Sequence, residues 1–374
     1  MTTGAFPVKL PPENCRWVAG ASHRQEPIIV QPQAGKGGLI TEEKNMKLKV
    51  AVVGLGIGRV HLKYYLENPE VEVVGAVDSH PDACRQVASE FKVKTFLSAE
   101  ELMKETRPDG VSLCTPPASH LALTRIFAGA GVHILCEKPM APTVSDCEQM
   151  METCEKNRVW LMLGFKKRFS PAYQFLKENF TGQFGLPRWV LARFALGRVE
   201  KKWFWDEQDG GGPIVENTVH MIDLLHFFLG EVVSVYAEGG NFFMPEFSPQ
   251  IDSAIFTLRF KNGAIAGVGA GYASEWGFAR EELSFASEKV AGEVTGLFDR
   301  PEKLRYVYRK KPAQVQEKNF SNADGFPGEI SHFLNCLKTG TEPAVTGKEG
   351  LAALKVCQAV KTSVRTGKPV FLKD

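Results

Sequence analysis

Short apolar runs rich in β-branched residues recur along the first half of the chain, separated by longer segments with helical periodicity. The runs predicted to be buried strands are 48–53, 71–78, 109–114, 132–136 and 159–163. The segments predicted to be helices are 79–91, 98–106, 119–130 and 143–158. Strands and helices that alternate in this way predict a doubly wound parallel sheet with helices on both faces.

The second half of the chain has a different pattern, in which apolar and polar positions partly alternate. The segments predicted to be strands there are 187–196, 231–241, 251–260, 263–273 and 281–287. Asn262-Gly263 falls between two of them and is a strong hairpin signal, because this pair tolerates the positive φ angles of a tight turn. These strands therefore favour an antiparallel sheet.

The first 46 residues lack hydrophobic periodicity and contain five prolines and five glycines. They include neither the apolar core of a secretory signal nor the Arg-rich amphipathic helix of a mitochondrial presequence. An arm lying on the protein or on a neighbouring subunit and a mobile tail are both open. We expect three segments: 1–46, a nucleotide-binding domain at 47–166, and a substrate-binding and oligomerisation domain at 167–374. Whether the C-terminal segment packs back on the nucleotide-binding domain is also open.

Composition removes several classes of protein. The 45 Lys and Arg residues nearly balance 43 Asp and Glu residues, so the chain has no electrostatic signature for nucleic acid or an anionic membrane. It contains no apolar run long enough to span a bilayer. The eight cysteines form no CxxC pair and several lie in apolar segments, which predicts reduced thiols in a cytoplasmic protein and no metal site.

A glycine-rich turn follows the first predicted strand. It contains Gly54, Gly56, Ile57 and Gly58. Glycines at this place let backbone N–H groups approach a pyrophosphate at a helix N-terminus. The usual dinucleotide fingerprint is GxGxxG, and here the third glycine comes one residue early. A tight strand-to-helix turn without a ligand is the alternative interpretation.

The end of the second predicted strand strengthens the nucleotide interpretation. Asp78 lies 24 residues beyond Gly54, close to the ~20 residues expected for the acid that binds the adenosine ribose. A carboxylate there accepts hydrogen bonds from the ribose hydroxyls and repels a 2′-phosphate, which favours NAD over NADP. The alternative is that Asp78 only caps the following helix.

Five motifs occur in a fixed order: GLGIGRVHL (54–62), TPPASH (115–120), CEKP (136–139), GFKKRF (164–169) and GGGPIVENTVHMIDLLHFFLG (210–230). Together they resemble the Gfo/Idh/MocA family of oxidoreductases, over about residue 47 to the end. The resemblance implies a nicotinamide-binding Rossmann domain and an α/β domain built on a large, mostly antiparallel sheet that makes subunit contacts. It also implies hydride transfer between a sugar or cyclitol alcohol and NAD or NADP.

The same resemblance assigns residues to the cofactor. It implies that Thr115, Pro116, Glu137 and Lys138 lie along the nicotinamide nucleotide, with Lys138 reaching the substrate. His120 belongs to the same motif, and both a cofactor contact and a packing role are open for it.

Oxidation of a secondary alcohol needs a base for the hydroxyl proton and a positive group for the developing alkoxide. A helix predicted to start near Pro213 places Glu216, His220 and Asp223 on one face, because their spacings are i, i+4 and i, i+3. We expect His220 to be the base, Glu216 to orient it, Asp223 to contact substrate, and Lys138 to bond the reacting oxygen. A packing role for His220 is the alternative. The family commonly has Asp where this chain has Glu216, which leaves its effect on the chemistry open.

Three further residues are expected at the substrate. Arg168 matches the family's arginine near bound substrate, where its planar fork can hold two hydroxyls or a carboxylate. Trp205 is a candidate floor for a sugar ring, with a core or interface role as the alternative, and Tyr272 is a further candidate contact. Lys166 and Lys167 are expected to be solvated.

The sequence thus predicts an NAD-dependent oxidoreductase that acts on a secondary alcohol of a sugar, sugar derivative or cyclitol. We expect a homodimer or homotetramer assembled through the C-terminal sheet. Two alternatives remain: a glycosidase or lyase that oxidises a sugar carbon transiently, and a cofactor-binding subunit without catalysis.

Overall fold

The computed structural model describes residues 47–321 and 323–372, and the expectations for residues 1–46 lie outside this part of the chain. The first sheet formed by the described residues has six strands in the order β3-β2-β1-β4-β5-β6, and all neighbouring strands are parallel. Its strands are β1 Leu48–Val53, β2 Val71–Val77, β3 Thr95–Phe96, β4 Gly110–Leu113, β5 His133–Glu137 and β6 Leu161–Gly164. The doubly wound sheet predicted from the sequence is confirmed.

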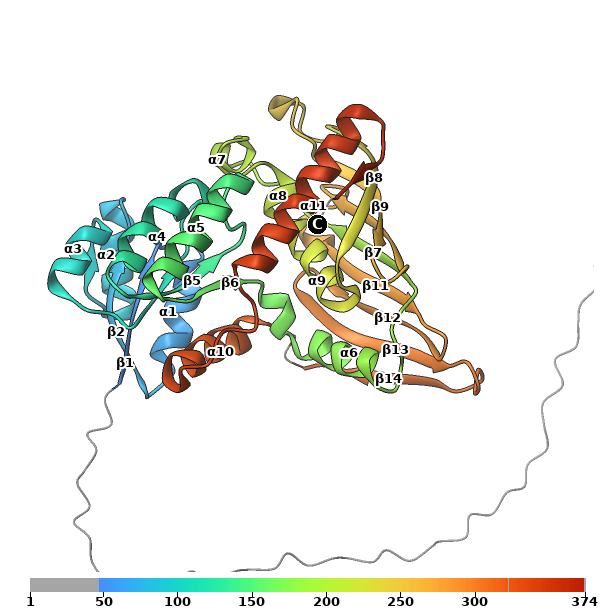
Figure 1. The fold of residues 1–374 in the computed structure, drawn as a ribbon, viewed down its shortest axis with the longest axis horizontal. Helices are drawn as coiled ribbons and strands as arrows, with labels where there is room; N and C mark the ends of the chain where they lie inside the picture. Colours follow the sequence, from blue (N-terminus) through green and yellow to red (C-terminus); the bar gives the residue numbers. More distant parts are fainter. Residues whose placement is uncertain (1–46, 322, 373–374) are drawn as a thin grey trace, which may run out of the picture. The chain divides into compact units, whose positions relative to one another are not determined.

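Helices connect these strands and cover the sheet (Figure 1). They are α1 Gly58–Leu66, α2 Pro81–Phe91, α3 Ala99–Glu105, α4 His120–Gly129 and α5 Val144–Asn157, with a short 3₁₀ turn η1 at Pro117–Ser119. The strand order reverses direction between β1 and β4. In doubly wound folds, ligands bind in the crevice at the carboxyl ends of the strands on either side of such a reversal.

The second sheet contains nine strands within the described residues, in the order β14-β13-β12-β11-β7-β10-β9-β8-β15. Only β7 and β10 pair in parallel, so the sheet is mostly antiparallel, as expected. Its strands are β7 Trp189–Ala195, β8 Val232–Gly240, β9 Ser253–Phe260, β10 Ile265–Gly271, β11 Arg280–Ala286, β12 Val290–Leu297, β13 Arg300–Tyr308, β14 Val315–Asn319 and β15 Val370–Phe371.

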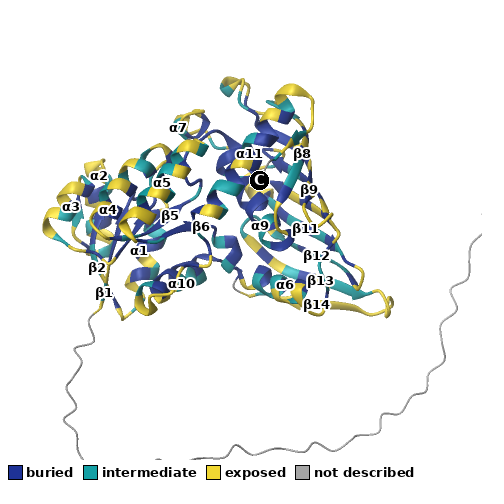
Figure 2. Ribbon diagram, in the orientation of Figure 1, coloured by how far each residue is buried: buried dark blue, intermediate teal, exposed yellow. Residues whose placement is uncertain are grey.

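Within the part of the chain that the structure describes, helices cover one face of this sheet and no helix covers the other. Residues along β7 and β9 alternate between buried and exposed, so one face of each strand packs inward (Figure 2). Helix α11 packs against β8, and α6 packs against β13. The helices that follow β6 in the chain are α6 Pro171–Thr181, α7 Lys202–Trp205, α8 Pro213–Glu216, α9 Val219–Leu229, α10 Phe326–Thr339 and α11 Gly347–Thr366. Three 3₁₀ turns complete the elements: η2 Lys166–Phe169, η3 Pro245–Phe247 and η4 Trp276–Phe278.

Helix α10 comes late in the chain but belongs to the core of the first sheet. It packs against α1, and its side chains Ile330, Phe333 and Leu334 share a buried cluster with Val50 and Leu62. Residues 326–339 therefore pack against the nucleotide half of the chain. Across the described part of the chain, no helix combines the length and apolarity that a membrane span needs.

Candidate active site

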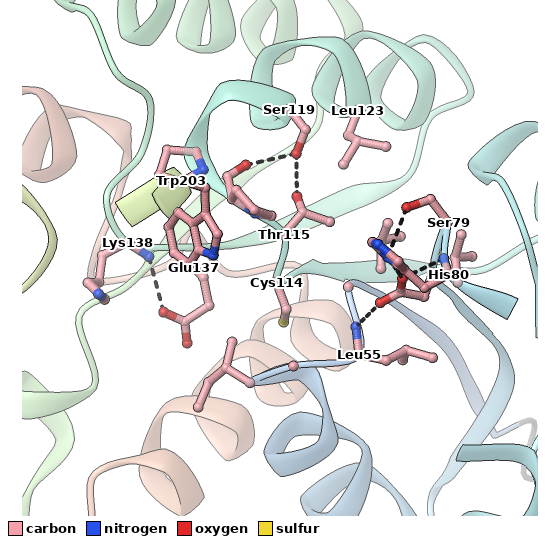
Figure 3. Close-up of a pocket in the computed structure, with 18 of the residues that line it drawn as sticks. Leu55, Ser79, His80, Cys114, Thr115, Ser119, Leu123, Glu137, Lys138 and Trp203 are labelled. Atoms are coloured by element: carbon pink, nitrogen blue, oxygen red, sulfur yellow. Dashed lines mark hydrogen bonds and ion pairs between the residues drawn. The ribbon is translucent and has the colours of Figure 1, made fainter. Parts of the chain in front are cut away.

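A cavity of about 860 Å³ opens at the reversal of the parallel sheet. One end, which we call the cofactor end, is lined by Gly54, Gly56, Ile57 and Asp78. The other, the reacting end, is lined by Lys138, Glu216 and His220, together with Glu137 and Trp203. Thr115, Pro116 and Ser119 also line the cavity, and Figure 3 shows Thr115 and Ser119 between Ser79 and Lys138. The volume is suited to a large cofactor.

The glycines of the turn allow other atoms to lie very close to its backbone. Gly54 has φ +91°, and a Cβ there would lie 2.5 Å from the carbonyl oxygen of Cys114, so any side chain would collide with the backbone after β4. A Cβ on Gly58, the first residue of α1, would lie 2.8 Å from Val52 Cγ1. A Cβ on Gly56 would meet no atom of the described residues within 4 Å. Gly54 and Gly58 thus serve packing, and Gly56 leaves open space for a ligand.

Asp78 is held at the cofactor end as an anion. Its carboxylate accepts hydrogen bonds from the backbone N–H of Leu55 at 2.9 Å and of His80 at 2.9 Å. Burial would raise the pKa of Asp78, but these hydrogen bonds outweigh it and hold the pKa below its usual value. Helix α2 begins at Pro81 with His80 as its N-cap residue, so Asp78 is not the cap of that helix.

His120 lies behind the cavity wall rather than on it. Its ring nitrogens lie 3.0 Å from the carbonyl oxygen of Met140 and 2.9 Å from that of Thr115, and burial lowers its pKa. The residues that line the cavity do not include it. Of the two roles left open for His120, the geometry favours packing, because it connects the loops that follow β4 and β5.

Lys138 and Glu216 form an ion pair at the reacting end. Lys138 Nζ donates to the Glu216 carboxylate at 3.0 Å and to its carbonyl oxygen at 2.7 Å. Both side chains are largely buried. Burial raises the pKa of Glu216, and the ammonium group of Lys138 opposes this rise. The pair therefore fixes a positive charge at the cavity wall.

His220 does not pair with Glu216, which corrects the expectation from helical spacing. The predicted single helix is two helices, α8 and α9, separated at Asn217 and Thr218, so the i, i+4 relation does not bring the side chains together. His220 is buried, and its Nδ1 has no hydrogen-bond partner among the described residues. Burial lowers its pKa well below the usual value, and the ammonium groups of Lys138, Lys167 and Lys166 lower it further. The imidazole is thus neutral at physiological pH.

Arg168 and Asp223 bind each other. Arg168 Nη2 donates to Asp223 Oδ1 at 2.7 Å and its Nε donates to Oδ2 at 2.9 Å, a two-pronged ion pair. Burial raises the pKa of Asp223 to about 6, although Arg168 opposes the rise. Both side chains are buried and neither lines the cavity. The pair joins η2 to α9, and the structure gives no support to the predicted substrate contacts of these two residues.

Trp205 and Tyr272 also lie outside the cavity lining in the described residues. The Trp205 ring stacks on Phe247 with centroids 4.5 Å apart, and its indole N–H donates to the Val199 carbonyl at 2.7 Å. Of the two roles weighed for Trp205, the structure favours packing. Its neighbour Trp203 lines the cavity instead, and Figure 3 shows it beside Lys138 and Glu137.

Asp299 lines the reacting end and was missed by the sequence analysis. It lies in the turn between β12 and β13 with φ +64°, a conformation that is unusual for a residue other than glycine. Its carboxylate binds Lys167 Nζ at 2.8 Å and forms a second ion pair with Lys166. Burial would raise the pKa of Asp299, but these two ammonium groups hold it far below its usual value.

Lys166 and Lys167 were expected to be solvated, and the structure corrects this expectation. Lys167 is buried because Glu281 and Asp299 both neutralise its charge, and Lys166 lies over the Phe326 ring at 4.1 Å. The local sequence gave no signal that Lys167 is buried, because the carboxylates that neutralise its charge lie more than a hundred residues away along the chain.

The doubly wound sheet carries Asp78, a carboxylate placed to bind a ribose, and the cavity extends from there to Lys138 and neutral His220. These features are typical of an oxidoreductase that uses a dinucleotide cofactor. Comparison with family models identifies the family of oxidoreductases. The chain belongs to the Gfo/Idh/MocA family: residues 48–165 match its oxidoreductase domain with an NAD-binding Rossmann fold, and residues 181–372 match its C-terminal alpha/beta domain.

Similar proteins span almost the same length. Myo-inositol 2-dehydrogenase of Thermotoga maritima is 26% identical over 87% of this chain and 99% of its own length. D-glucoside 3-dehydrogenase of Escherichia coli is 29% identical over 87% of this chain and 97% of its own. The crystal structure of aldose-aldose oxidoreductase from Caulobacter crescentus, complexed with glycerol, superposes with a TM-score of 0.78 at 25% identity, covering 87% of this chain and 100% of that one.

Proposed function

We propose that the protein is an NAD-dependent dehydrogenase that transfers hydride between the nicotinamide and a secondary alcohol of a sugar, sugar derivative or cyclitol. The observation that carries this proposal is the single cavity that joins the glycine turn and Asp78 to Lys138 and His220. The names of the similar dehydrogenases supply the substrate class.

The cofactor end fits the nucleotide. Gly56 leaves room where a pyrophosphate would approach the N-terminus of α1, and Asp78 is ionised and able to accept from ribose hydroxyls. Bound NAD would supply the hydride acceptor. We infer that Gly56, Ile57 and Asp78 hold the adenosine side, while Gly54 and Gly58 shape the turn, with Thr115, Pro116 and Glu137 along the path to Lys138.

The reacting end fits alcohol oxidation. The ammonium group of Lys138, fixed by Glu216, steadies negative charge on the substrate oxygen as the hydroxyl proton leaves. Neutral His220 accepts that proton, and Asp299 favours the resulting imidazolium against the charges of the nearby lysines. Glu216 thus acts through Lys138, and Asp299 supplies the negative charge that favours protonated His220.

The decisive experiment is a panel of sugars, cyclitols and aryl glycosides, assayed for NADH and for cleaved product. NADH formation with a polyol supports the dehydrogenase. Cleavage of a glycoside without net NADH would instead establish the transient-oxidation mechanism. Tight NAD binding with no turnover of any compound would leave a cofactor-binding subunit.

The exposed face of the second sheet supports a homo-oligomer. Trp189, Leu191, Ile255 and Ile265 are all at least 43% exposed, and the strand register places them on one face of β7, β9 and β10. An apolar patch on a regular sheet is typical of a subunit interface. We propose a homodimer or homotetramer through this face. The seven cysteines of the described residues are free and buried, which supports a cytoplasmic location.

A further inference from the structure

A half-exposed tryptophan lies just outside the reacting end of the cavity. Trp276, in η4, is 51% exposed, and its ring makes an edge contact with the ring of Phe298, with centroids 5.9 Å apart. Phe298 lines the cavity, and so does Asp299, which follows it in the chain and lies at the reacting end. One side chain therefore separates the Trp276 ring from the cavity.

The structure fixes the position of this ring. The indole N–H donates to the carbonyl oxygen of Arg198 at 3.0 Å. A Cβ on Gly197 would lie 2.5 Å from Trp276 Cγ and Cδ1, so any side chain at position 197 would collide with the indole. A ring that is already ordered loses little side-chain entropy when a ligand binds. The exposed face of Trp276 is therefore a rigid contact surface for a flat, partly apolar ligand.

Polar groups border the exposed ring. Arg198 Nη2 lies 3.0 Å from Glu275 Oε1, and both side chains are exposed. Lys201, from the same segment as Arg198, lines the cavity. A sugar ring presents C–H groups that pack on an aromatic face, and hydroxyls that bond to guanidinium and carboxylate groups at its edge. Because Glu275 neutralises Arg198, this pair favours hydroxyl groups over a phosphate.

We propose that Trp276 binds a second ring of the substrate, so that the preferred substrate is a disaccharide or larger glycoside rather than a monosaccharide or cyclitol. The reacting ring lies at Lys138 and His220, and the next ring extends past Phe298 onto Trp276. Phe298 connects the two places because it lines the cavity and also contacts the indole. This inference rests on the proposed dehydrogenase function and narrows its substrate class.

A partner subunit is the competing occupant of the Trp276 ring. Trp276 lies in the turn that follows β10, whereas the proposed interface is the exposed face of β7, β9 and β10. Its contact with Phe298 and its anchor on Arg198 place it among residues of the cavity side instead. A Trp276→Ala variant that dissociates into single chains in light scattering would assign the ring to a subunit contact and overturn the proposal.

Pairs of substrates that share the reacting ring test this subsite: methyl α-glucoside with maltose, methyl β-glucoside with cellobiose, and methyl β-galactoside with lactose. We expect the wild type to have a higher kcat/KM for the disaccharide in at least one pair. Trp276→Ala should lower that kcat/KM by ~5-fold or more, because one aromatic contact is lost, and should keep the value for the methyl glycoside within ~2-fold.

Two further variants separate a lost contact from a damaged fold. Gly197→Ala keeps the indole but displaces it, so it should reduce the disaccharide advantage as well. Trp276→Leu keeps an apolar side chain without the aromatic face and should give the same selective loss at a Tm close to that of the wild type. Phe242, in the loop after β8, is exposed like Trp276, and Phe242→Ala is the matched control that should change neither value.

Several results would overturn the subsite while the dehydrogenase stands. One is an equal effect of Trp276→Leu on both members of a pair. Another is a wild-type protein that oxidises myo-inositol or methyl glycosides better than every disaccharide. A preference for UDP-glucose that Trp276→Ala abolishes would assign the ring to a nucleotide base and overturn the proposal too.

Calorimetry separates failure of the subsite from failure of the proposed function. The protein is saturated with NADH, so that no turnover occurs, and titrated with the same pairs of glycosides. Tighter binding of a disaccharide than of its methyl glycoside, lost in Trp276→Leu, supports the subsite even if no compound yields NADH, a result that would refute the dehydrogenase alone. NADH formation without any Trp276-dependent difference in binding would refute the subsite alone.

Discussion

Two side chains at the reacting end of the cavity are expected to act on one substrate oxygen. His220→Ala removes the proton acceptor and should lower kcat by ~10²–10⁴ with little change in NAD affinity. Lys138→Ala should also lower kcat. Because both act on the same atom, the double variant should lose much less than the product of the single losses. Steady-state kinetics measure the losses in kcat, and NAD titration measures the cofactor affinity. Wild-type turnover by His220→Ala would show that the histidine is structural.

The charges around His220 predict shifts of the pH profile in opposite directions for two variants. Lys166 disfavours the protonated imidazole and Asp299 favours it. Lys166→Gln should therefore raise the pKa of His220 and move the acidic limb of kcat/KM to higher pH, while Asp299→Asn should move it to lower pH. Asparagine tolerates the positive φ of position 299. Exposed Glu302→Gln, on the neighbouring strand, is the control, and shifts of the same sign in both variants would contradict the assignment.

Asp78 should set the choice of cofactor. Its anion repels a 2′-phosphate by about 1–4 kcal/mol at short range, so Asp78→Asn should raise kcat/KM for NADP relative to NAD by roughly tenfold or more. Exposed Asp82→Asn removes the same charge from the neighbouring helix and should leave the ratio unchanged. A wild-type preference for NADP would show that another residue governs the pocket.

Residues that act within one motif could be identified from the sequence, and those that depend on distant partners could not. Gly54, Gly56, Ile57, Asp78 and Lys138 all line the cavity, and each belongs to a motif that is visible in the sequence. Arg168 was assigned to substrate from the family resemblance, and the local sequence gave no signal of its pairing with Asp223, which lies on another element. Asp299 gave no local signal, since it acquires its environment from residues far away in the chain.

At the scale of elements, five of the six strands of the first sheet and helices α2 to α5 agree with the predictions to within a few residues, because buried parallel strands are continuous apolar runs. The two-residue strand β3 was not predicted. The edge of the second sheet was harder to predict. Strands β12, β13 and β14 were missed because they carry glycines and charges and include many exposed or half-buried positions. The break between α8 and α9 was missed as well, because spacing alone predicts continuity.

The glycine turn gives a matched pair of variants. Gly54→Ala places a Cβ 2.5 Å from a backbone oxygen at φ +91°, so it should lower the free energy of unfolding by about 1–3 kcal/mol. Gly56→Ala meets no described atom within 4 Å and should leave unfolding nearly unchanged while weakening NAD binding. Thermal denaturation without cofactor, followed by NAD titration, separates the two effects. Equal destabilisation by both variants would contradict this division of roles.

At the scale of the whole molecule, the exposed sheet face should set the oligomeric state. Ile255 is 73% exposed on this face, and Ile255→Arg should reduce the mass measured by light scattering toward that of a single chain. Leu66 is also an exposed apolar residue, but it lies on α1, away from the sheet. Leu66→Arg should therefore leave the mass unchanged. A wild-type protein that is already monomeric at micromolar concentration would refute the proposed interface.

The return of α10 to the first sheet has a consequence for how the chain is made. Ile330, Phe333 and Leu334 fill the core beside Val50 and Leu62, and the ring of Phe333 lies against Gly110. A ribosome that has synthesised only the nucleotide half has therefore produced a domain whose core is still open on one side. The parallel sheet, although it comes first, can close only after nearly the entire chain has emerged. Until then its apolar surface is a natural target for chaperones, and nascent chains that stop before residue 326 should be degraded rather than accumulate as a working cofactor domain.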